Sequence, residues 1–344
     1  MRLAHIAPPW IPVPPLTYGG TELMVDLLVR GLRRKNFDVL VFCAGDSRLP
    51  APKAGPFPKS FWPPEKFSEN LHLAYAWRFL RDQPAALIHS HLENAAGFWQ
   101  AAGTRRPLVI TLHTPITDVK QEYLLNFPGV YLVAVSEFQR RRLQGHPRLQ
   151  VIPHGLDITA YHRPVPKEDF LLFLGRIYPE KGLHTAIAAA LAAEVTLVCA
   201  GPGFAPDQAY FDTEISPYLD NRRIIYVGPA NFDRKLELLS QARALLLPLE
   251  VDEAFGLVML EAMACGTPVV AYDRGAAAEV VVHGQTGFIA RTFSELLTGI
   301  DAVADIDPDN CRQHVARNFS ANGMVEAYAA LYKSILQEHL IDIL

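Results

Sequence analysis

The sequence predicts an α/β protein made of two halves, each a parallel β-sheet covered by helices. Short apolar runs, long enough for strands buried on both faces, alternate with helix-forming segments along the chain. This alternation starts again after a proline-containing linker at residues 158–167. At 344 residues the chain is long for one domain and comfortable for two. These observations predict two Rossmann-like domains with a cleft between them.

The composition is that of an ordinary globular protein without attraction to polyanions. Half of the residues are hydrophobic, a fifth are charged, and the formal net charge is −4 at pH 7. We therefore expect no nucleic-acid partner and at most peripheral membrane contact. The N-terminus lacks the long apolar core of a signal peptide, no apolar run reaches the length of a membrane span, and the four cysteines are far apart. Together these features predict a cytoplasmic protein.

The first half begins with a buried strand and a proline-rich loop. Prolines between residues 8 and 15 keep this loop extended as far as Gly19 and Gly20, and Thr21 is the expected N-cap of a helix with a leucine stripe. Residues 47–68 are rich in Pro, Lys and Phe and too irregular for an element, and a helix is expected around 70–81. The expected strands are residues 3–7, 38–44, 86–89, 108–112 and 131–135, and one that runs into the turn at 153–157.

The same order of elements returns after the linker. The expected strands are residues 170–174, 196–200, 224–227, 244–249 and 268–272. The expected helices open at 181–182, lie around 234–242 and 257–264, begin again at 293, and lie around 311–318 and 324–337. Loops that follow parallel strands share one edge of the sheet, which is where open α/β sheets bind ligands.

The chemistry of the second half concentrates in residues 244–290, which read as strand, acidic loop, helix and strand. The helix N-terminus favours phosphate, because its dipole and free backbone N–H groups lie at the carboxyl edge of the sheet. Glu253 in the loop and Glu261 on the helix frame this position. A single glutamate is more often a solvated charge, but Glu261 has apolar letters on every side. An unpaired carboxylate there is costly, so Glu261 needs a partner, and a ribose diol would supply one.

The letters EAFGLVMLEAMACGTPVVA resemble the Glu-x7-Glu signature of retaining family-4 glycosyltransferases. The resemblance implies that Glu253 contacts the hydroxyls of the donor sugar and that Glu261 holds the nucleotide ribose. It continues into GAAAEVVVHGQTGF, where Ala278 replaces the proline that is usual in the family while Glu279 and the Thr286-Gly287 pair remain.

This resemblance also implies the GT-B fold, in which two Rossmann-like domains face each other across a cleft. We expect an acceptor domain at residues 1–160 and a nucleotide-sugar donor domain at residues 161–320. A C-terminal helix within residues 321–344 is expected to pack back on the first domain.

The letters GRIYPEKG resemble the donor-diphosphate motif of the family at Arg176, Glu180, Lys181 and Gly182. Each cation alone is more often a surface charge, but Arg176 and Lys181 lie in one loop between a buried strand and a helix start. A guanidinium binds phosphate oxygens in bidentate fashion, and an ammonium acts as a point charge. The sequence has no Asp-x-Asp or histidine cluster of metal-ligand type near a strand end. We therefore expect these cations to replace a metal.

His91 stands just past the carboxyl end of a strand, where site residues lie in this architecture. A lone histidine is often structural, but the family places one, in a similar His-x-His pattern, close to the donor sugar. A glycine pair such as Gly19-Gly20 is more often a plain turn, yet the family has one near the diphosphate. The family also has a glycine-containing turn beneath the nucleotide, which Gly201 resembles, and a strand that ends at the base, which Gly228 follows here. With the helix start before Glu261, the expected donor-binding positions are Gly19, Gly20, Gly201, Gly228, Phe255, Gly256 and Leu257.

The resemblance therefore implies a retaining hexosyltransferase of polysaccharide biosynthesis, with Glu253, His91, Arg176 and Lys181 as catalytic residues. The donor is expected to be a nucleotide diphosphate sugar, with uracil as the base and a glucose-type sugar, and no further cofactor or metal is expected. The acceptor stays open between a glycan, a lipid-linked and a small-molecule one. Residues 47–68 either line the acceptor site or form a surface excursion.

Two other classes of protein stay open. A sugar-nucleotide epimerase of the same fold would share the phosphate-binding residues but needs acid and base carboxylates facing the sugar ring, which the Glu-x7-Glu pattern does not favour. A non-catalytic nucleotide-sugar-binding protein would keep Arg176, Lys181 and Glu261 without needing Glu253 or His91. Release of free nucleoside diphosphate, with and without acceptors, separates the three classes.

Overall fold

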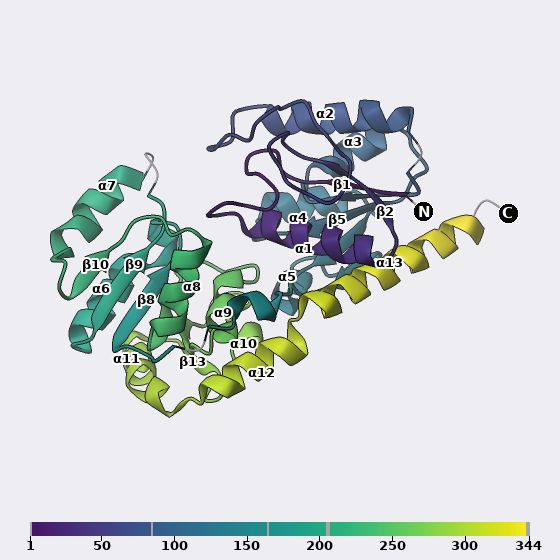
Figure 1. Ribbon diagram of the computed structural model, residues 1–344. Coiled ribbons are helices and arrows are strands. Elements are labelled where there is room, and N and C mark those ends of the chain that lie inside the picture. The colour runs from purple at the N-terminus through teal and green to yellow at the C-terminus, as the bar shows by residue number, and fades with distance from the viewer. Residues whose placement is uncertain (1, 84, 164, 204–206, 342–344) are drawn as a thin grey trace. The chain divides into compact units, whose positions relative to one another are not determined.

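A computed structural model of the chain describes residues 2–83, 85–163, 165–203 and 207–341. The chain forms two compact units, which we call unit 1 (Met1–Gly155 with Ala321–Leu344) and unit 2 (Leu156–Ser320) (Figure 1). The units divide between Gly155 and Leu156, a few residues before the boundary expected after residue 160.

The described residues of unit 1 form a seven-stranded parallel sheet in the order β3-β2-β1-β4-β5-β6-β7. Its strands are β1 (Arg2–Ile6), β2 (Asp38–Phe42), β3 (Lys53–Ala54), β4 (Leu87–Ser90), β5 (Leu108–Leu112), β6 (Tyr131–Ala134) and β7 (Leu149–Val151). Every predicted strand is present, with ends shifted by a residue or two. The expectation that residues 47–68 contain no element is wrong, because β3 lies there and pairs with β2. Such pairing depends on the neighbouring strand more than on local sequence.

The helices of unit 1 are α1 (Gly20–Arg34), α2 (Ser68–Arg81), α3 (Ala95–Ala101), α4 (Asp118–Leu125), α5 (Glu137–Arg141) and α13 (Ala321–Ile341). Helix α1 begins at Gly20 with Gly19 as its N-cap, not Thr21, and Gly19 has a φ of 148° that other residues rarely adopt. Helix α13, from the end of the chain, packs along α1 (Figure 1). Gly31 permits this contact, because a Cβ there would lie 2.3 Å from Val325 Cγ2.

The described residues of unit 2 form a six-stranded parallel sheet in the order β10-β9-β8-β11-β12-β13. Its strands are β8 (Phe170–Leu174), β9 (Thr196–Ala200), β10 (Ile224–Tyr226), β11 (Ala244–Leu247), β12 (Val269–Tyr272) and β13 (Gly287–Ala290), the last of which was not predicted. Its helices are α6 (Leu183–Ala192), α7 (Gln208–Tyr210), α8 (Phe232–Gln241), α9 (Leu257–Ala264), α10 (Ala277–Val280), α11 (Phe293–Ala302) and α12 (Pro308–Asn318). Two 3₁₀ turns matter for the site, η1 (Ile158–Tyr161) and η2 (Pro179–Lys181).

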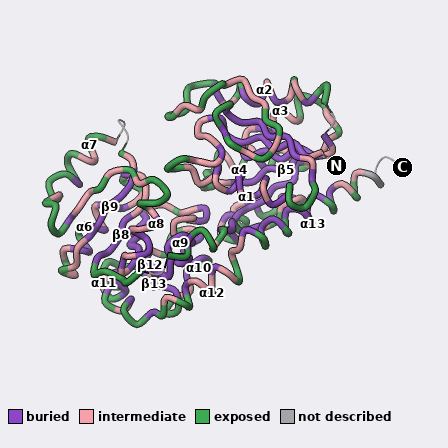
Figure 2. The backbone as a smooth tube through the Cα atoms, viewed as in Figure 1, coloured by how far each residue is buried: buried purple, intermediate pink, exposed green. Residues whose placement is uncertain are grey.

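The inner strands of both sheets are buried, as their near-continuous apolar runs predict, whereas β3, β7 and β10 are partly exposed (Figure 2). Ile6 and Ile110 belong to the core of unit 1, and Phe173 and Leu246 to that of unit 2. The predicted class of two Rossmann-like α/β domains is confirmed. No described helix combines the length and the apolar character that a membrane crossing requires.

Each sheet has a point where the strand order reverses, and this point positions the candidate site residues. In unit 1 the reversal lies between β1 and β4, so the loops at 7–19 and 91–94 leave adjacent strands in opposite directions. In unit 2 it lies between β8 and β11, which are followed by the loops at 175–182 and 248–256. Ligands of open α/β sheets bind in the crevice that such diverging loops leave at the carboxyl edge.

Candidate active site

The predicted diphosphate loop and the predicted acidic loop meet at the switch point of unit 2. Arg176 and Lys181 follow β8, and Glu253 follows β11, the strand that pairs with β8. Lys181 Nζ lies 2.5 Å from Glu253 Oε2, and the two side chains are 22% and 19% exposed. The pair is therefore shielded enough to hold a defined geometry and open enough to meet a ligand. Two of the four predicted catalytic residues are thus in direct contact.

The close approach of these two loops depends on Gly182. This residue has a φ of 71°, and a Cβ on it would lie 1.9 Å from the carbonyl oxygen of Pro248. A hydrogen bond from the Glu250 N–H to the carbonyl oxygen of Glu180, at 2.9 Å, ties the loops together beside it. Only glycine meets both the conformational and the steric requirement.

The glycines predicted to lie beneath the nucleotide draw three strand ends together. Gly201 follows β9, and a Cβ on it would lie 1.7 Å from the carbonyl oxygen of Gly175, which follows β8. Its N–H donates to the carbonyl oxygen of Gly228, after β10, at 2.9 Å. Arg176 lies in the same region, with its guanidinium carbon 4.8 Å from the centre of the Tyr178 ring. Stacking of this kind restricts the guanidinium to a plane without consuming its charge.

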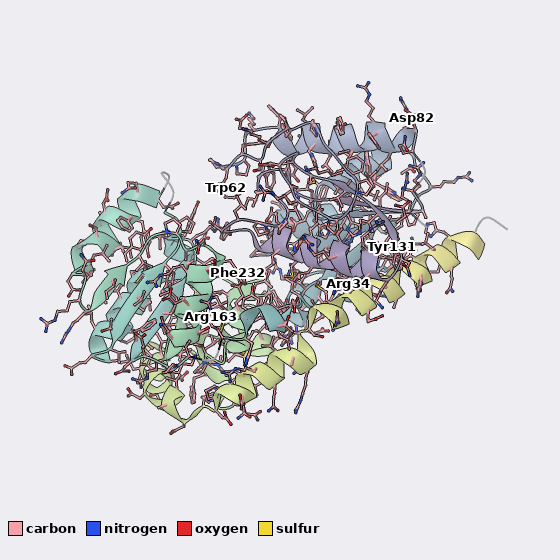
Figure 3. The ribbon with its side chains drawn as sticks, in the orientation of Figure 1. Arg34, Trp62, Asp82, Tyr131, Arg163 and Phe232 are labelled. Atoms are coloured by element: carbon pink, nitrogen blue, oxygen red, sulfur yellow. The ribbon has the colours of Figure 1, made fainter. Side chains whose placement is uncertain are left out.

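Glu261 lies on α9 and is 6% exposed. The partner that this buried carboxylate needs is supplied twice by the protein itself. The hydroxyl of Tyr161, in η1, donates to Oε1 at 2.9 Å, and Lys235, on α8, forms an ion pair with the same oxygen. Burial, followed by the charge of Glu261, raises the pKa of Tyr161 far above its ordinary value, so the phenol remains a donor. Phe232, at the start of α8 (Figure 3), packs edge-on against the Tyr161 ring.

Sequence reasoning missed Tyr161 and Lys235. Tyr161 falls in the segment taken as a linker, and Lys235 is one of several polar residues on an amphipathic helix. The available signal was the buried carboxylate itself, which requires a cationic or hydroxyl partner somewhere in the chain.

The start of α9 presents backbone N–H groups beside Glu253. Gly256 is the N-cap with a φ of 85°, and Leu257 is the first residue of the helix. Phe255 is 4% exposed and packs edge-on against Phe319, which fixes the entry of the chain into the helix. The first-turn N–H groups have no partner within the helix, so this end is suited to an anion.

In unit 1, Gly19 and Gly20 open α1 at the carboxyl edge, after the loop that follows β1. The carboxyl group of Glu22 lies against this glycine pair, since a Cβ on Gly19 would be 2.8 Å from Glu22 Oε2. Glu22 is 4% exposed, and burial raises its pKa to about 7. Position 19 therefore requires glycine, because the buried carboxyl group of Glu22 packs directly against it.

His91 follows β4, as predicted, but it is 5% exposed and its ring nitrogens face other histidines. Nδ1 lies 2.9 Å from His113 Nε2, and Nε2 lies 3.4 Å from His5 Nδ1. Burial, and then the neighbouring His89 and His113, keep the pKa of His91 well below its ordinary value, so the ring is neutral. His5, His91 and His113 thus form a histidine row, and His113, which is half-buried, also stacks on His154. It was not among the predicted site residues, although it follows a predicted strand.

Among the described residues, His5, His89 and His91 form a group with spacing suited to a metal, their ligand atoms lying within 4.8 Å of one another. The expectation that no histidine cluster of this type lies near a strand end is therefore wrong, because the sheet register brings His5 on β1 opposite His89 on β4, which the sequence does not reveal. His89 already contacts two hydroxyls, with Nδ1 2.6 Å from that of Tyr332 and Nε2 2.8 Å from that of Thr111. An ion bound by these three rings would have to displace one of these contacts.

Comparison with known proteins covers nearly the whole chain. A family model described as "Glycosyltransferase Family 4" matches residues 18–160, and one described as "Glycosyl transferases group 1" matches residues 158–315. Alpha-maltose-1-phosphate synthase of Mycolicibacterium smegmatis is 32% identical over 360 residues, with 88% of this chain and 90% of that protein covered.

Solved structures of similar fold match residues in both units. A glycosyltransferase involved in avilamycin A biosynthesis is 27% identical, with a TM-score of 0.74 and 98% of each chain covered. HepE of Anabaena, solved in complex with UDP and glucose, is 21% identical, with a TM-score of 0.76, and the match covers 97% of this chain and 100% of that one. At this identity the second likeness shows the fold alone.

Proposed function

Because this chain belongs to the glycosyltransferases, as its family matches and its 32%-identical relative show, we propose that it is a retaining hexosyltransferase using a nucleotide diphosphate sugar. The observation that carries the proposal is the contact of Lys181 with Glu253 beside Arg176, where the loops after β8 and β11 diverge. A site for a sugar diphosphate needs cations for the phosphates and a carboxylate for the sugar hydroxyls, and this position has both. UDP-glucose is the first donor to test, since HepE of Anabaena was solved with UDP and glucose.

In this proposal Arg176 and Lys181 stabilise the charge that develops on the leaving diphosphate. The guanidinium binds two phosphate oxygens, the ammonium supplies a point charge, and the N–H groups at the start of α9 add dipoles aimed at the same anion. Glu253, released from Lys181 by the incoming phosphate, orients the sugar by accepting hydrogen bonds from its hydroxyls. These cations do the work that a metal ion does in other sugar transferases, so we propose that turnover needs no metal.

Glu261 binds the ribose in this scheme. Both of its protein contacts, from Tyr161 and Lys235, use Oε1, which directs Oε2 to the ribose hydroxyls. Lys235 pairs with the carboxylate, and the Tyr161 hydroxyl keeps it in one orientation. The ribose is therefore met by a preformed acceptor and does not have to order a mobile side chain.

The transfer forms a bond between an acceptor oxygen and the anomeric carbon of the sugar. The bond from that carbon to the diphosphate oxygen breaks, and its electron pair leaves with the nucleoside diphosphate. The proton of the acceptor hydroxyl passes to the departing diphosphate. We propose retention of the anomeric configuration on the Glu253-to-Glu261 spacing that the chain shares with the retaining family.

The test is release of nucleoside diphosphate from UDP-glucose and other nucleotide sugars, with and without acceptors, in buffer containing EDTA. The proposal expects release that rises with a suitable acceptor and persists in the chelator. Loss of release in EDTA with recovery on added Mg²⁺ or Mn²⁺ would instead point to metal-assisted transfer. The 32%-identical relative is named for a phosphorylated sugar, so sugar phosphates belong in the panel beside neutral sugars.

The two alternative classes predict different products. A sugar-nucleotide epimerase would change the donor sugar without any acceptor. A non-catalytic nucleotide-sugar-binding protein would bind the donor and release nothing. Glu253 lies beside Lys181 at the carboxyl edge. This position favours sugar transfer over a non-catalytic nucleotide-sugar-binding protein, because recognition of ribose and diphosphate alone does not need the Glu253 carboxylate.

A further inference from the structure

A polar cluster occupies the carboxyl ends of β4 and β5 in unit 1, next to His113. Thr114 Oγ1 donates to Glu93 Oε1 at 3.0 Å, and Lys120 Nζ lies 2.6 Å from Glu93 Oε2. Lys120 also contacts Thr114 Oγ1 and donates to the carbonyl oxygen of Pro115 at 2.9 Å. The side chains of Glu93 and Lys120 are each 19% exposed, so the pair is ordered and still reachable.

Glu69, in the first turn of α2, completes this group, which we call the strand-end cluster: Glu69, Glu93, Thr114 and Lys120. The hydrogen bond from Asn94 Nδ2 to Asn70 Oδ1, at 3.2 Å, joins the residues next to Glu93 and Glu69 and so brings the start of α2 to this cluster. Burial first, and then the negative charge of Glu93, raise the pKa of Glu69 to about 7, against an opposing effect of Lys120. Near neutral pH this carboxyl therefore both accepts and donates hydrogen bonds. Glu93 differs, because it is already fixed by an ammonium and a hydroxyl.

Two buried polar atoms beside the strand-end cluster have no hydrogen-bond partner in the part of the chain that the structure describes. They are Asn94 Oδ1, one residue after Glu93, and His113 Nδ1, one residue before Thr114. The other polar atom of each side chain is engaged, since Asn94 Nδ2 donates to Asn70 Oδ1 at 3.2 Å and His113 Nε2 faces His91. Buried polar atoms are nearly always paired in native proteins, so these two point to a hydrogen-bonding ligand that completes the cluster.

Exposed aromatic side chains precede α2 on the side of Glu69. Trp62 is 41% exposed and Phe67 is 67% exposed. Trp62 and Asp82 lie at opposite ends of α2 (Figure 3), which places Trp62 toward the first turn of that helix. Large exposed rings near convergent polar groups are typical of ligand sites and offer a flat apolar surface to the C–H face of a sugar.

Resting on the proposed function, we infer that the strand-end cluster binds the acceptor, and that this acceptor is a neutral or amine-bearing sugar and not a phosphorylated one. Carboxyl groups accept hydrogen bonds from sugar hydroxyls and pair with a sugar ammonium. Lys120, the cation of the cluster, has all three of its ammonium donors engaged, by Glu93, Thr114 and the carbonyl oxygen of Pro115. Lys181 differs, because the side-chain contact that the described residues give its ammonium is with Glu253 alone. A phosphate placed here would meet Glu93 and the ionising Glu69 without a cation to compensate it, and like charges at close range repel strongly in a shielded site.

The cluster also assigns separate tasks to its two carboxyl groups. Lys120 and Thr114 hold Glu93 in one position, so Glu93 sets where an acceptor hydroxyl lies. Glu69 has no ammonium or hydroxyl contact of this kind among the described residues, so it adapts its protonation to a neutral or a cationic acceptor. Both are therefore specificity-determining residues of the acceptor site.

The test measures initial rates of nucleoside diphosphate release by the full chain. The donor is the nucleotide sugar that the protein hydrolyses fastest when no acceptor is present. The acceptors are glucose and maltose, glucosamine, and glucose 6-phosphate. We expect the neutral and amine-bearing sugars to raise the rate, with kcat/KM about tenfold or more above that for the phosphate. Equal or better use of glucose 6-phosphate overturns the inference, and so does a panel in which no neutral or amine-bearing sugar raises the rate.

Matched variants locate the effect. E69Q and E93Q are each expected to raise the acceptor KM by about tenfold and to narrow the preference over the phosphate, while the Kd for UDP stays unchanged. E122Q, exposed on α4 outside the cluster, is the control. The assignment is refuted if E69Q and E93Q keep the wild-type acceptor KM and the wild-type preference for neutral or amine-bearing sugars over glucose 6-phosphate. Failure of the proposed function looks different, because wild-type protein would then neither bind UDP nor hydrolyse a nucleotide sugar before any acceptor is added.

Discussion

Glu253 and Glu261 are the two carboxylates of one sequence signature, but their surroundings differ. Oε1 of Glu261 is held by Tyr161 and Lys235, so this side chain is in place whether or not a nucleotide is bound. Glu253 is paired with Lys181 and is more exposed, so a ligand can part the two. This difference suits a constant contact to the ribose for Glu261 and a contact to the transferred sugar for Glu253.

We predict that Glu261→Gln weakens UDP binding by about tenfold or more, because the ribose loses a charged acceptor in the ground state and the transition state alike. Glu253→Gln should leave UDP binding nearly unchanged while kcat falls, because its interaction matters only when the sugar is present. Calorimetric titration of UDP into each variant, beside steady-state rates, measures both quantities. If Glu253→Gln lost UDP as severely as Glu261→Gln, the two roles would be wrongly assigned.

Glu22 gives a prediction about stability and pH. Burial raises its pKa from the ordinary 4.5 to about 7, so the folded state disfavours the ionised form. The resulting penalty is absent below the unfolded pKa, grows as pH rises from about 4.5 to 7, and is fully present above it. Glu22→Gln should therefore raise the free energy of unfolding of unit 1 by up to about 3 kcal/mol near pH 8 and by nothing near pH 4.

Urea unfolding at both pH values measures this effect, with exposed Glu122→Gln as the control. A gain for Glu22→Gln that is equal at both pH values would show that packing, and not ionisation, is responsible.

At this scale the sequence predicts residues that lie close together in the chain and misses those that the fold assembles. Arg176 and Lys181 were found because five positions in one loop place both beside one helix start. Tyr161 meets Glu261 from 100 residues away, and no local pattern marks that contact. The histidine row depends on the register of β1 on β4, which a sequence pattern does not specify. His91 was chosen for its position after a strand, and its burial became visible only with the neighbouring rings in place.

Among the elements, the loop between β8 and α6 depends most on a single glycine. Gly182 and Gly284 have similar φ values, 71° and 75°, but only Gly182 has a neighbour that an added Cβ would strike. Gly182→Ala should therefore lower the free energy of unfolding of unit 2 by more than Gly284→Ala, whose cost of about 1 kcal/mol is conformational alone.

Gly182→Ala should also weaken UDP binding, because the added Cβ pushes the loop after β8 away from Pro248 and moves Lys181 with it. Denaturant midpoints and UDP titrations of the two variants provide the comparison. Equal destabilisation in both, with UDP affinity preserved, would show that the contact with Pro248 is not what holds the loop.

Elements with strong internal patterns were predicted well, and those defined by partners were not. Buried parallel strands such as β8 and β11 are continuous apolar runs and stand out in the sequence. The short strands β3 and β13 exist through pairing with β2 and β12, and their own letters do not require them. Helix α1 starts two residues early because Gly19, with its positive φ, caps it in place of the hydroxyl side chain of Thr21.

At the scale of the whole molecule, two sheets of the same design carry different chemistry at their switch points. Unit 2 holds the cations and carboxylates proposed for the donor, and unit 1 holds the histidine row and the strand-end cluster. The repeated order of strand, loop and helix predicted this fold, because each sheet must be covered on both faces to bury its strands. Family membership follows from matches that run through both units.

The central claim is that Arg176 and Lys181 stabilise the departing diphosphate. The most direct test is kcat/KM for the nucleotide sugar in Arg176→Ala and Lys181→Ala, measured in EDTA, with exposed Arg222→Ala as a control in the same unit. Loss of one charge-stabilising donor should lower kcat/KM by about a hundredfold or more in each site variant and leave the control near wild type. Wild-type values, within about twofold, in both site variants would contradict the claim.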